Sequence, residues 1–190
     1  YTVMKDVIPE NTVLSHDLLE GSYLRCGLAT DIMLMDGYPS NYISFMTRLA
    51  RWIRGDFQIC NWLCSKIKNN KEKIIQNPLN NISKYKIFDN LRRGTVSLFT
   101  IILLTYGLII QNHFVSILSL IIINISEILE ILNRIIFRKD GQKFRKTFAP
   151  TINGIEGIII RILLNIALLP TKAYIETKSI IQALYRKYIS

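Results

Sequence analysis

Two uncharged apolar runs, separated by a short polar turn, constrain this chain more than any other feature of its sequence. Residues 94–110 read GTVSLFTIILLTYGLII and hold no charged side chain, and residues 113–132 hold none before Glu127. A helix needs about 20 apolar residues to cross a bilayer, with a lower limit near 17. The first run reaches that limit, and the second reaches it if Glu127 and Glu130 lie at the interface or pair with Arg134 one turn later. We therefore predict a transmembrane helical hairpin over residues 94–133; the alternative is a buried helical hairpin in a soluble protein.

Cationic side chains flank this hairpin on both sides and indicate its orientation. The chain has a net charge of +10, although 49% of its residues are apolar. The flanking cations are Lys66, Lys68, Lys71, Lys73, Lys84, Lys86, Arg92 and Arg93 before the hairpin, and Arg134, Arg138, Lys139, Lys143, Arg145 and Lys146 after it. The turn between the runs has no Lys or Arg. By the positive-inside rule, we predict a multi-pass protein of the cytoplasmic (inner) membrane with both hairpin ends in the cytosol.

Composition divides the rest of the chain into three further segments. Residues 1–65 mix charges, aromatic side chains and glycines in the manner of a globular domain. Residues 66–93 are basic, and we expect them to dock on anionic lipid as an interfacial segment. Residues 134–190 begin as a basic cytoplasmic loop and end in two amphipathic or coupling helices, separated by Pro170. The pattern leaves open whether residues 151–169 lie in the interface or span the membrane. Basic and aromatic residues do not alternate, so nucleic acid is not a predicted partner.

The candidate catalytic residue lies in the segment VLSHDLLEG, residues 13–21. We predict a short strand over residues 12–14 that leads His16 and Asp17 to the start of a helix. A carboxylate in that position is kept ionised by backbone N–H groups and by the helix dipole. Asp17 could then accept a proton from a sugar hydroxyl as a general base, with Glu20 as the alternative base. The plain alternatives are that Asp17 only caps the helix and that His16 is a structural histidine.

A second cluster of candidate residues lies in RLARWIRGDFQ, residues 48–58. Arg48, Arg51 and Arg54 carry guanidinium groups, which can clamp a diphosphate with paired hydrogen bonds. Trp52 offers a flat apolar face on which a sugar ring can stack. The alternative is an interfacial helix whose arginines reach from an apolar surface into water.

The order of these motifs resembles a known enzyme class. It runs strand, S-H-D, helix, strand, an acidic turn with proline (DGYPS), then a helix with R-x-x-R-W-x-x-G. This resembles the C-terminal half of the catalytic domain of family 2-like inverting glycosyltransferases such as cellulose and chitin synthases. In those enzymes T-E-D supplies the base and Q-x-x-R-W lines the acceptor site. On that resemblance Asp17 takes the place of the T-E-D aspartate, and Arg51 and Trp52 that of the R-W pair. Arg48 stands where the motif has Gln, which is a departure from the pattern.

Longer segments resemble the cyclic β-1,2-glucan synthase family more specifically. They are SHDLLEGSYLRCGL, DGYPS, RWIRGDFQ, IFDNLRR and LLPTKAYIETKSIIQALYR, in that order. The resemblance implies a UDP-glucose-dependent β-1,2-glucosyltransferase whose partners are the nucleotide sugar, the growing glucan chain and the lipid bilayer. It also implies a divalent cofactor, Mg²⁺ or Mn²⁺, whose ligands we expect upstream of this chain together with the donor nucleotide pocket.

These inferences combine into one predicted fold class. We expect an α/β membrane protein, in which the C-terminal part of a GT-A-like glycosyltransferase domain (residues 1–65) precedes the transmembrane hairpin and the amphipathic helices. Because the sequence starts at Tyr1 rather than Met, we expect missing N- and C-terminal parts of the same polypeptide, and no activity of this piece alone. Cys60 and Cys64 are read as small buried helix residues rather than as metal ligands. Two alternatives stay open: another processive β-glycan synthase (cellulose- or chitin-like), and a non-catalytic membrane anchor or assembly module.

Overall fold

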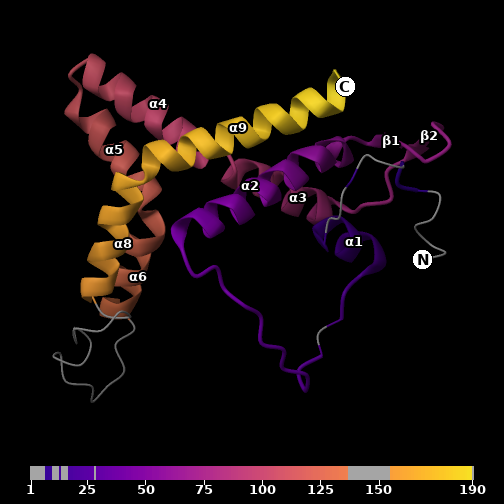
Figure 1. The fold of residues 1–190 in the computed structure, drawn as a ribbon, viewed down its shortest axis with the longest axis horizontal. Coiled ribbons are helices and arrows are strands. Elements are labelled where there is room, and N and C mark those ends of the chain that lie inside the picture. The colour runs from indigo at the N-terminus through magenta and orange to yellow at the C-terminus, as the bar shows by residue number, and fades with distance from the viewer. Residues whose placement is uncertain (1–6, 10–12, 14–16, 28, 137–154, 190) are drawn as a thin grey trace. The chain divides into compact units, whose positions relative to one another are not determined.

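The computed structural model describes residues 7–9, 13, 17–27, 29–136 and 155–189, and helices dominate this part of the chain (Figure 1). The chain divides into two compact units. Unit 1 comprises Tyr1–Thr95 together with Ile175–Ser190, and unit 2 comprises Val96–Tyr174. Each unit is described by itself below.

Unit 1 combines helices with one small antiparallel sheet. Its elements are α1 (Asp17–Leu24), α2 (Tyr42–Gln58), the 3₁₀ helix η1 (Ile59–Leu63), β1 (Lys66–Lys68), β2 (Ile74–Gln76), α3 (Asn81–Arg93) and the C-terminal part of α9 (Leu169–Tyr188). Asn41 and Asn80 begin α2 and α3, because each side chain accepts a hydrogen bond at 2.8 Å from the backbone N–H three residues later. Ile67 of β1 pairs with Ile75 of β2. The Asn69 carboxamide closes the turn between the strands by accepting from two backbone N–H groups.

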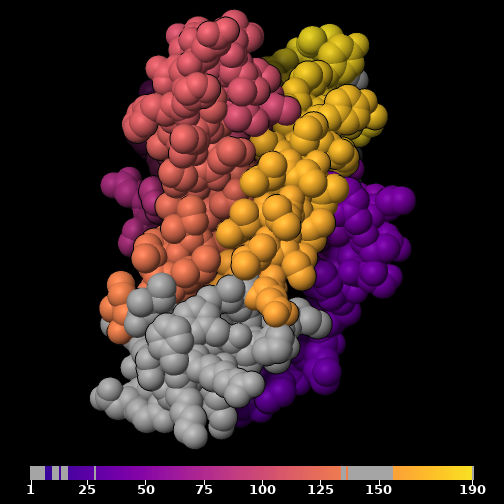
Figure 2. Space-filling view, turned by 90° about the vertical axis from the view of Figure 1, so that its left-hand side faces the viewer, coloured from indigo at the N-terminus to yellow at the C-terminus, as the bar shows by residue number. Residues whose placement is uncertain are grey.

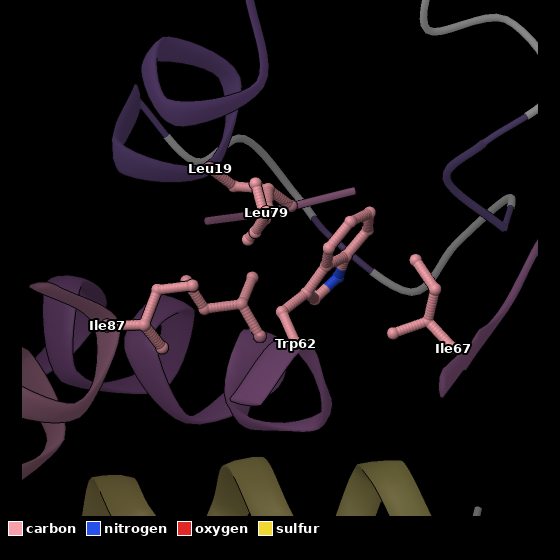
Figure 3. Close-up of a cluster of buried hydrophobic side chains, with 6 residues drawn as sticks. Leu19, Trp62, Ile67, Leu79 and Ile87 are labelled. Carbon is pink, nitrogen blue, oxygen red and sulfur yellow. The ribbon is translucent and has the colours of Figure 1, made fainter. Parts of the chain in front are cut away.

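An apolar core holds unit 1 together (Figure 3). It is formed by six buried side chains from α1, η1, β1, α3 and the loop before α3: Leu19, Ile59, Trp62, Ile67, Leu79 and Ile87. In Figure 3 the indole of Trp62 lies between Ile67 on one side and Leu79 and Ile87 on the other. Asn77 fixes this arrangement from the backbone side, since its amide nitrogen donates to the carbonyl oxygens of Trp62 at 2.6 Å and Cys64 at 2.8 Å. Burying one such side chain stabilises a fold by about 1.5–3 kcal/mol.

Unit 2 is entirely helical in its described residues. It contains α4 (Val96–Ile109), α5 (His113–Ile123), α6 (Ile125–Ile136), α8 (Ile155–Ala167) and the first turn and a half of α9. Helices α4 and α5 pack closely where Gly107 faces Ser116, since a Cβ atom on Gly107 would lie 2.7 Å from the Ser116 hydroxyl oxygen. Helices α6 and α8 lie side by side (Figures 1 and 2). The break predicted at Pro170 is present two residues earlier: α8 ends at Ala167 and α9 begins at Leu169, with Pro170 in the first turn of α9, where proline is tolerated.

Unit 2 differs from unit 1 in the side chains that it buries, although Ile158 and Leu169 are buried there as well. Its buried residues include small and polar ones: Ser97, Thr100, Gly107, Ser119 and Asn124. Many of its large apolar side chains are exposed instead, among them Phe99, Ile109, Phe114, Ile117, Leu129, Ile160, Leu163 and Leu164. Unit 2 therefore exposes the kind of surface that a water-soluble domain normally buries.

A polar network joins α6 to α8. Arg161 of α8 forms an ion pair with Glu130 of α6 at 2.5 Å. One turn further along α8, the Asn165 amide nitrogen donates to the side-chain oxygens of Asn124 at 3.2 Å and Glu127 at 3.1 Å. These contacts fix the register of the two helices, because each polar group finds its partner in only one alignment.

The predicted fold class, an α/β GT-A-like domain followed by a transmembrane hairpin, is wrong. Strands are limited to β1 and β2 in the described residues, each three residues long. The strand expected before DGYPS is absent, and residues 29–40 form no regular element. An apolar run alone does not make a strand, because a strand needs a neighbour for its hydrogen bonds. The strand predicted over residues 12–14 lies, apart from Val13, outside the described residues.

The predicted hairpin fails as a membrane span for a different reason. The two apolar runs do form adjacent helices, but α4 has 14 residues and α5 has 11. At 1.5 Å per residue these helices are about 21 Å and 16 Å long, against about 30 Å for a hydrocarbon core. The second run is bent by 70° where Asn124 interrupts it. Among the described residues, only bent pairs of helices have the combined length and apolar character of a span, and no individual helix has both.

Candidate functional site

The candidate base Asp17 is the first residue of α1, and its side chain is exposed. Glu20, the alternative base, is also exposed on this helix, and Leu19 between them is fully buried in the core of unit 1. Leu19 therefore anchors α1 and leaves both carboxylates in solvent. Neither carboxylate has a hydrogen bond or ion pair with another described residue. His16 lies outside the described residues.

The second cluster lies along α2, as the motif order predicted a helix there. Met46 and Ile53 are buried, with 6% and 3% of their surfaces exposed, and they determine the rotation of α2 about its own axis. With those two inside, Arg51 is exposed, Arg54 is half-buried and Trp52 retains 48% of its surface. The residues predicted to bind substrate are thus accessible, which is the minimum requirement for a binding role.

One pair of predicted site residues is brought into direct contact. The guanidinium carbon of Arg48 lies 4.4 Å from the centroid of the Trp52 ring, a cation–π arrangement across one helical turn. No such contact joins Asp17 to Arg51 or Trp52 in the described part of the chain. Helices α1 and α2 both pack against α3, which is their shared support within unit 1. The assignment of these residues to one site stays a prediction.

Two features near α2 were not predicted from the sequence. The rings of Tyr38 and Phe45 are stacked, with centroids 6.4 Å apart and planes inclined by 29°. Lys187 near the end of α9 donates a hydrogen bond to the Gln58 carbonyl oxygen at 2.9 Å and lies 3.1 Å from the Cys60 sulfur. The two aromatic residues on either side of the start of α2 were the available sequence signal for the first. Nothing in the local sequence indicates the second, which joins residues far apart in the chain.

The cysteine environment differs in part from the prediction of two buried residues. Cys60 is half-buried in η1, whereas Cys64 is exposed directly after that helix. The charge of Cys60, followed by burial, raises the pKa of the Tyr188 hydroxyl above its ordinary value of 10.0. The Tyr188 hydroxyl also lies 3.3 Å from the Asn61 side-chain oxygen.

The residues that the structure describes do not form a metal centre. Within the described ranges, no group of three His, Cys, Asp or Glu side chains is placed to hold an ion. A divalent ion prefers several oxygen ligands at once, and isolated exposed carboxylates such as Asp17 do not provide them. The Mg²⁺ or Mn²⁺ expected from the resemblance, with ligands outside this chain, therefore stays an expectation.

Comparison with known proteins supports the resemblance at a general level. The chain is 30% identical over 194 aligned residues, 98% of its length, to the cyclic beta-(1,2)-glucan synthase NdvB of Rhizobium meliloti (strain 1021). This chain is related to a glucan synthase. The aligned region is only 6% of that protein's length. No family model and no solved structure matches the chain.

Proposed function

We propose that this chain forms part of a UDP-glucose-dependent glucosyltransferase that extends a β-1,2-linked glucan. The supporting observation is the similarity to a cyclic β-1,2-glucan synthase along 98% of the chain. The exposed Asp17 carboxylate and the exposed Arg51–Trp52 pair supply the side-chain types that sugar transfer requires. All three residues belong to unit 1.

The proposed reaction is a single in-line displacement at the anomeric carbon. Asp17 accepts the proton of the acceptor hydroxyl as its oxygen forms a bond to that carbon. The bond from the anomeric carbon to the diphosphate breaks with inversion, and UDP leaves with the electron pair. Arg51 and Arg54 donate hydrogen bonds to the diphosphate or to the acceptor end, and Trp52 stacks on a sugar ring. No step depends on a metal ion bound to this chain.

Replacement of the proposed base tests this assignment. In the full-length protein, Asp17→Asn keeps the shape of the side chain but removes its basicity. We expect glucan synthesis to fall by about 10²–10⁴-fold, the usual contribution of a general base, while UDP-glucose binding is retained. Glu20→Gln is the matched variant on the same helix and should retain most activity. Normal turnover by Asp17→Asn, with loss in Glu20→Gln, would reassign the base to Glu20.

Analysis of the product distinguishes the enzyme classes that remain. A β-1,2-linked glucose polymer is expected from UDP-glucose. A β-1,4-linked glucan or an amino-sugar polymer would instead support the cellulose- or chitin-like alternative. If no nucleotide sugar is turned over and both Asp17→Asn and Trp52→Ala leave the protein's biological activity intact, the chain is a non-catalytic assembly module.

We also propose that unit 2 contacts a lipid bilayer and that the protein acts at the cytoplasmic membrane, with Asp17 on the cytosolic side. The support is the apolar exterior of unit 2 and the cationic residues of 66–93. Cosedimentation of the full-length protein with anionic vesicles tests this. Ile160→Ser with Leu163→Ser should lower the bound fraction. Met33→Ser with Ile43→Ser, which are more exposed than the first pair but belong to unit 1, should not. Equal loss in both double variants would refute the proposal.

A further inference from the structure

Four side chains lie in a row along α2 and the irregular segment before it. Phe45, Arg48 and Trp52 are spaced i, i+3 and i+7, which places them on one face of the helix. Tyr38, from the turn that precedes α2, stacks on Phe45 at 6.4 Å. Arg48 lies over Trp52 at 4.4 Å. We call this row, in the order ring, ring, guanidinium, ring, the α2 stripe.

Both ends of the α2 stripe are accessible to a ligand. Tyr38 has 79% of its surface exposed and Trp52 has 48%. Phe45 and Arg48 between them are half-buried. Arg48 covers part of the indole, and a sugar would contact the part of Trp52 that remains exposed. The buried residues of α2, such as Ile53, lie on a different side of the helix.

The chemistry of the α2 stripe suits a chain of sugars. A pyranose ring has an apolar C–H face, which fits an aromatic ring, and hydroxyl groups around its rim. A guanidinium has five N–H donors and no acceptor, so it can donate to those hydroxyl oxygens. Arg48 forms no ion pair with another described residue, and its donors are therefore available. The rise from Phe45 to Trp52 is about 10 Å at 1.5 Å per residue, longer than a single sugar ring.

We propose that the α2 stripe binds consecutive glucose units of the growing glucan. Trp52, next to the candidate residue Arg51, holds the sugar at the reacting end, and Tyr38 holds a sugar further along the chain. Arg48 stands where the family motif has Gln. It holds the Trp52 ring in place and lies between the two rings, Tyr38 and Trp52, that contact the sugars. This inference rests on the proposed function, because it takes a glucan as the ligand.

Binding of linear β-1,2-linked gluco-oligosaccharides to the full-length protein tests the proposal. Calorimetric titration without nucleotide sugar should give tighter binding for a hexasaccharide than for a disaccharide. Tyr38→Ala should weaken hexasaccharide binding by about three- to tenfold, the range that one aromatic contact supports, and leave the disaccharide unaffected. Trp52→Ala should weaken both ligands. Tyr38→Phe should restore the hexasaccharide affinity, because the ring rather than the hydroxyl makes the contact.

The matched control is Tyr85→Ala on α3, where the tyrosine is 66% exposed and lies outside the α2 stripe. It should change neither affinity. Equal affinities for the two oligosaccharides, or equal effects of Tyr38→Ala and Tyr85→Ala, would overturn the proposal. The outcome is separable from the proposed function: length-dependent binding with no glucan synthesis by the unaltered protein would reject the transferase assignment and retain the α2 stripe as a glucan-binding surface.

Discussion

The two units of this chain are both rich in helix, yet they differ in the side chains that they bury. In unit 1 the buried cluster is apolar, with Trp62 and Ile87 among its members. In unit 2 Ser97 and Ser119 are almost completely buried, while Phe114 and Leu163 are largely exposed. Apolar content therefore does not reveal what a helix packs against. It shows only that a large apolar surface must be covered, either by other parts of the chain or by an apolar environment outside it.

The contrast extends to the forces that hold each unit together. Unit 1 gains stability by removing apolar side chains from water. Unit 2 leaves much of that surface exposed, and its helices meet instead through close contact at Gly107 and through the polar contacts of Asn165 and Arg161. Helices surrounded by an apolar medium associate in this way, through small residues and hydrogen bonds across the interface.

The largest predicted effect concerns the core of unit 1. Trp62→Ala should lower the local free energy of unfolding by about 3–5 kcal/mol, because it removes the largest buried ring and leaves a cavity. Hydrogen exchange of amides in η1 and α3 should accelerate accordingly, whereas amides of α4 and α5 should be unchanged. The other tryptophan provides the control, since Trp52→Ala on the surface of α2 should leave exchange in η1 unaltered. Equal acceleration in both units would mean that they unfold together and do not differ in stability.

The next effect concerns the contact between α4 and α5. Gly107→Ala would place a Cβ atom 2.7 Å from the Ser116 hydroxyl oxygen and 2.9 Å from its backbone nitrogen, so the helices must separate. Overpacking costs about 1–3 kcal/mol and alanine gains a helix about 1 kcal/mol, so we expect a net loss of stability of up to about 2 kcal/mol. Hydrogen exchange in α4 and α5 measures it. Gly27→Ala in unit 1 is the control, since nothing lies within 4 Å of its added Cβ atom. Slower exchange in Gly107→Ala would show that close packing does not hold unit 2.

Much of the local structure was readable from the sequence, because it depends on neighbouring residues. Local rules predict the start of α1 at Asp17, the helix over the R-W motif and the break near Pro170. These follow from helix capping, hydrophobic periodicity and the chemistry of proline, respectively. The bend at Asn124 was missed, since one Asn in an apolar run does not normally end a helix. Its side chain donates back to the Leu120 carbonyl oxygen at 2.9 Å and also accepts from Asn165 of α8. That second contact depends on tertiary structure, which a local pattern does not reveal.

The candidate site shows the same division between local features, which the sequence predicts, and tertiary features, which it does not. The exposure of Arg51 and Trp52 follows from the helical period, once the buried positions of α2 are known. The strand expected before DGYPS was inferred from motif order alone, and Met33, Leu34 and Met35 are instead 88–97% exposed. Sequence order predicts a fold only if the partner strands are present. Whether Asp17 and Trp52 act on one substrate depends on the arrangement of α1 and α2, which no pattern within either segment determines.

The smallest predicted effect compares one buried hydroxyl in each unit. Tyr42 and Ser97 each have a buried oxygen without a hydrogen-bond partner among the described residues. Tyr42→Phe and Ser97→Ala should therefore each be neutral or stabilising by up to about 1 kcal/mol, since an unsatisfied buried group is removed.

The effect of pH on stability should differ between these two variants. Burial raises the pKa of Tyr42 above 10.0, so the unfolded state loses this proton first as the pH rises, and unit 1 loses stability above pH 10. Tyr42→Phe should reduce that loss and leave the part due to Tyr188, whose pKa is also raised. Urea unfolding followed by tryptophan fluorescence measures it, because Trp52 and Trp62 both lie in unit 1. Ser97 does not titrate, and Ser97→Ala should leave the profile unchanged; a profile that Tyr42→Phe does not alter would show that the Tyr42 hydroxyl reaches water.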